Sequence, residues 1–99
     1  MRVNLSDLAA MGAKPHLYLL SLALSADTDE AWVADFATGL AEDQEAFGIR
    51  LAGGDTVLTP GPTTLTLTAL GQVAAGKALL RSGAEVGDAI YVTGTIGDG

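Results

Sequence analysis

The sequence predicts a small domain of the α+β class, in which a mixed or antiparallel sheet carries helices on one face. Segments with helical and strand periodicity follow one another in the order helix, strand, helix, strand, strand, strand. The chain has 99 residues, which allow one hydrophobic core at most. Its 48% of hydrophobic residues and its 13 glycines are typical of an aliphatic globular domain and not of a disordered chain.

The first helix is predicted over residues 3–12. Leu5, Leu8 and Ala9 recur on one side at helical spacing, and Lys14-Pro15 ends the pattern.

The second helix has the clearest pattern in the chain. Asp27 or Thr28 is its expected N-cap, and apolar side chains recur on one face until Gly48. These side chains are Trp32, Val33, Phe36, Leu40 and Phe47, and we expect Trp32 and Phe36 to lie in the core.

Four segments have strand patterns. Residues 16–24 form a nearly continuous apolar run, which is typical of a strand covered on both faces. Residues 49–52 predict a brief strand that ends at the sequence GGDT of residues 53–56. Residues 63–69 alternate threonine with leucine or alanine, which predicts a half-exposed antiparallel strand. A last strand is expected at residues 89–93, after the polar turn Gly87-Asp88.

Charge and cysteine content exclude several classes of function. The formal net charge of −7 provides no basic surface for nucleic acid or for an anionic membrane. The sequence has no cysteine, so it has neither disulfides nor thiolate metal sites, which suits a cytoplasmic protein. No run is long and apolar enough to span a membrane or to serve as a targeting signal. We therefore expect neither nucleic acid nor membrane as a partner.

Three places combine suitable residue types with suitable local structure for binding an anion and its metal ion. Asp7 is a carboxylate among apolar neighbours, which fits a cation ligand or, alternatively, the solvent edge of a helix. Gly54 and Asp55 follow a strand, where glycine admits a phosphate and aspartate holds Mg²⁺, although an ordinary turn has the same pattern. Arg81 is either a phosphate ligand or a solvated surface side chain.

One segment imitates a nucleotide-binding loop. Gly71 and the pair Gly76-Lys77 have the spacing of the phosphate loop of nucleoside triphosphatases. The next residue is Ala78, where that motif needs a hydroxyl for Mg²⁺, so we reject this interpretation.

Three motifs together resemble the thiamine-monophosphate kinase family in order and spacing. They are NLSDLAAMGA at residues 4–13, GGDT at residues 53–56, and LRSGA followed by GDAIYVTG at residues 80–84 and 87–94. The resemblance covers essentially the whole chain.

The resemblance implies a fold, a reaction and a set of site residues. It implies the fold of aminoimidazole ribonucleotide synthetase-like proteins, whose two-domain subunits form homodimers through the sheets of their N-terminal domains. The implied reaction transfers a phosphoryl group from ATP to thiamine monophosphate with several Mg²⁺ ions. Asp7 and Asp55 would bind magnesium, and Gly54, Asp55 and Arg81 would contact ATP. No catalytic nucleophile is implied.

The resemblance also implies that the chain is an internal piece of the enzyme and inactive alone. We expect residues 1–93 to form a partial N-terminal ATP-binding, magnesium-binding and dimerisation domain, and residues 94–99 to begin the linker to a C-terminal domain. Two alternatives stay open: a non-catalytic nucleotide-binding or dimerisation module, and a sister ATP-dependent synthetase.

Overall fold

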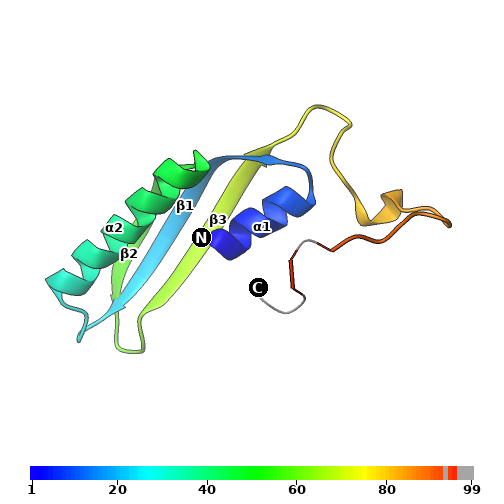
Figure 1. The fold of residues 1–99 in the computed structure, drawn as a ribbon. Coiled ribbons are helices and arrows are strands. Elements are labelled where there is room, and N and C mark those ends of the chain that lie inside the picture. Colours follow the sequence, from blue (N-terminus) through cyan, green and yellow to red (C-terminus); the bar gives the residue numbers. More distant parts are fainter. Residues whose placement is uncertain (93, 96–99) are drawn as a thin grey trace.

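The computed structural model describes residues 1–92 and 94–95 of the chain (Figure 1). The elements are α1 (Arg2–Ala10), β1 (Lys14–Ser25), α2 (Glu30–Phe47), β2 (Arg50–Thr59), β3 (Thr64–Gln72) and the short 3₁₀ helix η1 (Arg81–Gly83). The strands form one sheet in the order β2-β1-β3, in which β1 is parallel to β2 and antiparallel to β3. The predicted α+β class with a mixed sheet is confirmed.

Both helices pack on the same face of the sheet, as predicted. The buried core consists of Leu5 from α1, Tyr18 and Leu20 from β1, and Ile49, which directly precedes β2. Phe36 and Leu40 of α2, with Leu67 and Ala69 of β3, complete this cluster. Because α1 and α2 contribute to one cluster over β1, the domain has two layers.

The other face of the sheet is uncovered within the described residues. On β3 the threonines and leucines alternate as predicted, with Leu67 half-buried towards the helices and Thr66 and Thr68 exposed. The expectation that residues 16–24 are covered on both faces is wrong, because Leu19 is 44% exposed. Its continuous apolar run indicates a central strand, but only one of its faces meets the helices.

A cluster of hydroxyl groups joins the end of β1 to the connection between β2 and β3. The Thr63 Oγ1 accepts a hydrogen bond from the Ser25 backbone N–H at 3.0 Å and lies 2.8 Å from the Thr28 Oγ1. Thr28 is therefore used by this cluster and does not cap α2. The cap is Asp29, whose Oδ1 accepts from the Trp32 N–H at 2.8 Å, so the expectation of Asp27 or Thr28 is wrong.

Of the two aromatic side chains of α2 that we expected in the core, Trp32 lies outside it. Trp32 is 39% exposed and stacks on Phe36, with ring centroids 5.2 Å apart, so Phe36 alone of the pair packs against the core. At the other end of α2, the Arg2 Nε donates to the Asp43 Oδ1 at 3.1 Å, and the Arg2 guanidinium lies over the Phe47 ring. These contacts connect α2 to the start of α1.

The second strand runs much further than predicted. The sequence GGDT does not end a brief strand but lies inside β2, which continues to Thr59. A β-bulge at Ala52 shifts the register between the pairs Tyr18/Leu51 and Leu19/Gly53, and pairing with β1 resumes beyond it. Gly54 has a φ of +158°, and a Cβ there would overlap the Leu20 carbonyl oxygen. Glycine therefore permits the strand to continue where its sequence indicates a turn.

The region after β3 contains the other departure from expectation. Residues 89–92 form no strand and pair with no strand of the described sheet, and Ile90 and Tyr91 are 94% and 87% exposed. The polar turn at Gly87-Asp88 is present, and the Asp88 Oδ2 accepts from the Glu85 N–H at 2.9 Å. Thr93 and most of the expected linker at residues 94–99 lie outside the described residues.

We expect Gly54→Ala to destabilise the chain by about 1–3 kcal/mol, because the methyl group must displace the backbone of β1. The measurement is urea unfolding followed by circular dichroism. Gly39→Ala is the matched control: Gly39 lies in α2 with open space around it, and alanine should add about 0.5–1 kcal/mol of stability there. Equal effects of the two substitutions would contradict the role of Gly54.

We expect Tyr18→Phe to stabilise the chain by roughly 1 kcal/mol, since the buried Tyr18 hydroxyl has no hydrogen-bond partner among the described residues. Tyr91→Phe, at an exposed position, should change the unfolding free energy little.

The same residue predicts a pH dependence. Burial raises the pKa of Tyr18 above its ordinary value of 10.0, so above about pH 10 the unfolded chain releases this proton first. The free energy of unfolding should therefore fall with rising pH above 10, and it should fall less steeply in Tyr18→Phe. Parallel pH profiles for the two proteins would contradict this assignment.

Candidate functional site

Asp55 stands in the middle of β2, at an edge of the described sheet. The register pairs it with Ser21, and Ser21 with Thr66 of β3, so the three polar side chains form a row on the uncovered face. The Asp55 carboxylate is exposed, and its Oδ1 accepts a hydrogen bond from the Thr56 N–H at 2.9 Å. This hydrogen bond orients the carboxylate and leaves oxygen lone pairs for a cation.

A groove of about 540 Å³ runs along β2 beside Asp55. Leu20, Leu22 and Leu51 give it apolar walls on the helix side of the sheet, opposite to the Asp55 side chain, and Gly53, Gly54, Asp55 and Thr56 line the remainder. Gly53 and Gly54 carry no side chains, so only their backbone atoms border this groove. Sequence reasoning missed the leucines and the row through Ser21 and Thr66, although the alternation in β1 and β3 indicates which side chains share a face.

Asp7 lies on α1, which packs mainly against β3 and β1. Its side chain is exposed, so within this chain Asp7 has the solvent-edge position that was the alternative to a metal site. Exposure also leaves the carboxylate accessible to an ion held by another part of a larger assembly.

Arg81 is the first residue of η1 and is also exposed. It follows residues 73–80, which leave the end of β3 and return to the end of α1, where the Met11 carbonyl accepts from the Leu79 N–H at 3.0 Å. We call residues 73–80 the strap.

The candidate residues are not brought together in this chain. Asp7, Asp55 and Arg81 belong to three elements, and neither Asp7 nor Arg81 lines the groove beside Asp55. Among the described residues, no three carboxylate, histidine or cysteine side chains gather closely enough to hold a metal ion. The oxygen donors of Asp55 and Asp7 suit Mg²⁺, which prefers carboxylate ligands together with water and phosphate oxygens.

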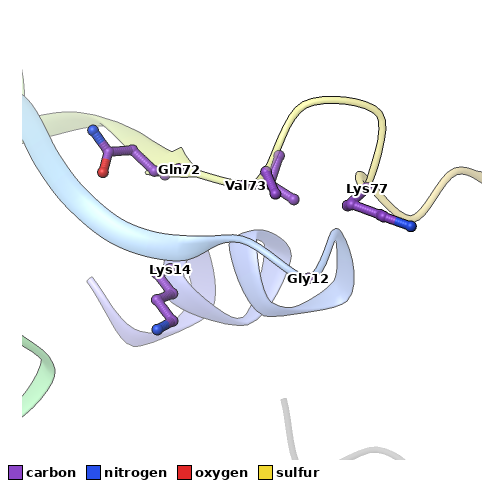
Figure 2. Close-up of a pocket in the computed structure, with 7 residues that line it drawn as sticks. Gly12, Lys14, Gln72, Val73 and Lys77 are labelled. Carbon is purple, nitrogen blue, oxygen red and sulfur yellow. The ribbon is translucent and has the colours of Figure 1, made fainter.

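A second hollow, of about 910 Å³, lies between the end of α1 and the strap (Figure 2). Lys14 and Lys77 line it, but Figure 2 shows their side chains pointing in different directions, so their charges do not converge on one ligand. The residues after β3 also form no helix at Lys77, and a phosphate loop requires one.

No helix among the described residues has the length and apolar character needed to cross a membrane.

Thiamine-monophosphate kinases are similar to this chain along its whole length. The enzyme of Caulobacter vibrioides is 50% identical over 99 residues, which are 100% of this chain and 28% of the enzyme. The enzyme of Escherichia coli is 52% identical over 98 residues, 99% of this chain and 29% of the enzyme. The chain thus spans less than a third of the length of the curated relatives it matches.

Solved structures agree with these relatives. Thiamine-monophosphate kinase from Stenotrophomonas maltophilia superposes with a TM-score of 0.70 at 47% identity, over 78% of this chain and 23% of that one. AaThiL complexed with AMPPCP and TMP superposes with a TM-score of 0.66 at 28% identity, over 70% and 22% of the chains. Escherichia coli HypE, a hydrogenase maturation protein, shares the fold at 20% identity, with a TM-score of 0.64 over 72% and 24% of the chains.

The family described as AIR synthase related protein, N-terminal domain, matches residues 1–73. These residues include α1, the whole sheet and Asp55, which are the parts that carry the core and the groove. The chain belongs to the family of AIR synthase related proteins, and the matched residues correspond to its N-terminal domain.

Proposed function

We propose that this chain is part of a thiamine-monophosphate kinase, which transfers the γ-phosphoryl group of ATP to thiamine monophosphate and forms thiamine diphosphate. The observation that carries the proposal is the 50% identity to the Caulobacter vibrioides kinase over all 99 residues. The complex of AaThiL with AMPPCP, an ATP analogue, and TMP supports the same pair of substrates.

In this proposal Asp55 is the central metal ligand. Its exposed carboxylate would bind Mg²⁺ beside the phosphates of ATP, and Gly54, which carries no side chain, would admit those phosphates. Arg81 would bind a phosphate oxygen, and Asp7 would bind a further Mg²⁺ ion. When bound, Mg²⁺ neutralises charge on the two anionic substrates, and holding them in line provides most of the catalysis.

Sequence identity favours the kinase over other enzymes that share the same fold. Curated thiamine-monophosphate kinases, including the Bacillus subtilis enzyme, are 40–52% identical to this chain over at least 95 residues. HypE structures are only 18–20% identical, a level that supports the shared fold alone. A non-catalytic module is disfavoured because Asp7, Gly54, Asp55 and Arg81 are all present.

We also propose a cytoplasmic homodimer in which the uncovered face of the sheet is the contact surface, which would place the Asp55 carboxylate on that face at the boundary between the two subunits. Leu19 of β1, Val57 of β2 and Leu70 of β3 are 44%, 50% and 46% exposed, and the register assigns all three to this face. An apolar sheet face of this kind is stabilised when a second sheet covers it. The absence of cysteine suits a reducing compartment.

A chimera tests the kinase proposal. This chain replaces the 99 matching residues of the Caulobacter vibrioides enzyme, and formation of thiamine diphosphate from ATP and thiamine monophosphate is measured. We expect an active chimera, and no activity from the 99-residue chain alone. Asp55→Asn should lower kcat/KM by roughly 10²-fold or more and raise the Mg²⁺ concentration needed for half-maximal rate.

Asp35→Asn is the control, because Asp35 is an exposed carboxylate of α2 remote from β2 in sequence. It removes the same charge and should leave kcat/KM and the Mg²⁺ dependence unchanged. A folded but inactive chimera would contradict the proposal, and so would equal effects of the Asp35 and Asp55 substitutions.

The dimer is tested by sedimentation of the same chimera. Leu19→Glu should convert the dimer to a monomer, since it places a charge in the centre of the proposed contact. Val3→Glu, at a 70% exposed position of α1, should leave the dimer intact. A dimer that survives Leu19→Glu at low micromolar concentration would exclude this surface as the contact.

A further inference from the structure

The strap is attached to the end of α1 at one point, Leu79. The Leu79 N–H donates to the Met11 carbonyl at 3.0 Å, and the Leu79 side chain lies against Gly12. Figure 2 shows the strap leaving β3 at Val73, arching outwards and turning back towards Gly12 at Lys77. The attachment therefore links the strap, which follows β3, to the C-terminal end of α1.

Two glycines make this attachment possible. A Cβ on Gly71 would lie 2.9 Å from the Ala13 Cβ and 3.0 Å from the Lys14 carbonyl oxygen, so only glycine lets β3 end so close to the connection between α1 and β1. Gly12 has a φ of +70°, and a Cβ there would lie 3.4 Å from the Leu79 Cγ. A Cβ at residue 12 would thus be in ordinary contact with Leu79, so a branched side chain such as valine would crowd Leu79.

A short hydrogen-bonded segment connects Leu79 to Arg81. Leu79 is two residues before Arg81, and the Gly83 N–H donates to the Leu80 carbonyl at 3.0 Å, which closes the turn of η1. Within the strap, the Lys77 N–H donates to the Ala74 carbonyl at 2.9 Å. At the other end, Met11 is the C-cap of α1, the helix that carries Asp7.

We propose that Leu79 is a positioning residue of the ATP site, because it holds Arg81 at a set place relative to α1 and hence to Asp7. The inference rests on the proposed function, in which Arg81 binds a phosphate oxygen. An arginine on an unattached segment loses conformational entropy when it binds, and that loss weakens binding. The Leu79 contact removes part of this loss before ATP arrives.

The test compares two neighbouring leucines in the active chimera. Leu79 and Leu80 are both 62% exposed, but only Leu79 contacts Gly12. We expect Leu79→Ala to raise KM for ATP about fivefold, the factor for losing one partly buried leucine contact. Its kcat should stay within about twofold, since binding common to ground and transition states is lost. Leu80→Ala should change neither constant, and Leu79→Met should restore most of the affinity.

A double-mutant cycle separates positioning from general loosening of the structure. In the Arg81→Ala background, Leu79→Ala should have no further effect on KM for ATP, because the side chain that it positions is gone. Equal effects of Leu79→Ala and Leu80→Ala would overturn the inference, as would an undiminished effect of Leu79→Ala without Arg81. Lack of activity in the unsubstituted chimera would instead contradict the proposed function.

Substitution at Gly12 provides a second route to the same answer. Gly12→Val and Gly48→Val place the same side chain at two helix ends with φ of +70° and +65°, so they share the backbone strain. Only residue 12 faces Leu79, while the space around residue 48 is open. Gly12→Val should therefore raise KM for ATP and Gly48→Val should not. Equal KM values for the two variants would count against the positioning role.

Discussion

The hydrogen-bonded pairing of β1 on both of its edges is the constraint on which the rest of this structure depends. β2 and β3 do not pair with each other in the sheet, and each pairs with β1. The same strand presents Tyr18 and Leu20 to both helices, so it also supplies the centre of the core. The core accounts for the apolar residues on one face of this strand, while Leu19 makes its uncovered face apolar as well.

The position of the site follows from that pairing. Because α2 connects β1 to a parallel β2, the chain must cross the end of β1 again to place β3 on the other side, and the hydroxyls of Ser25, Thr28 and Thr63 hold this crossing. Strand β2 is then an edge strand of the described sheet, and its bulge lets Gly54 lie against the Leu20 carbonyl. One glycine thus serves both the pairing of the sheet and access to the peptide groups beside Asp55.

The elements that depend on local pattern could be predicted from sequence, and those that depend on partners could not. The alternation in residues 63–69 and the apolar face of the second helix are local, and the structure contains both. GGDT has the composition of a turn, but hydrogen bonds to β1 extend β2 through it. Residues 89–92 have strand propensity but join neither edge of the described sheet. Asp29 caps α2 because Thr28 is drawn into a hydroxyl cluster formed with a residue far along the chain.

The sequence indicated which residue types form the candidate site. It could not predict that Asp7, Asp55 and Arg81 lie apart, because their separation depends on where α1 and the strap lie. Asp55 and Asp7 are among the carboxylates that give the chain its net charge of −7, and both proposed substrates are anions. Cations must therefore offset this repulsion, and one carboxylate on an edge strand binds Mg²⁺ weakly without further ligands. The chain spans 28% of the Caulobacter vibrioides kinase. The geometry thus favours a site completed by groups from the rest of such an enzyme, with β2 supplying one carboxylate and an open stretch of backbone.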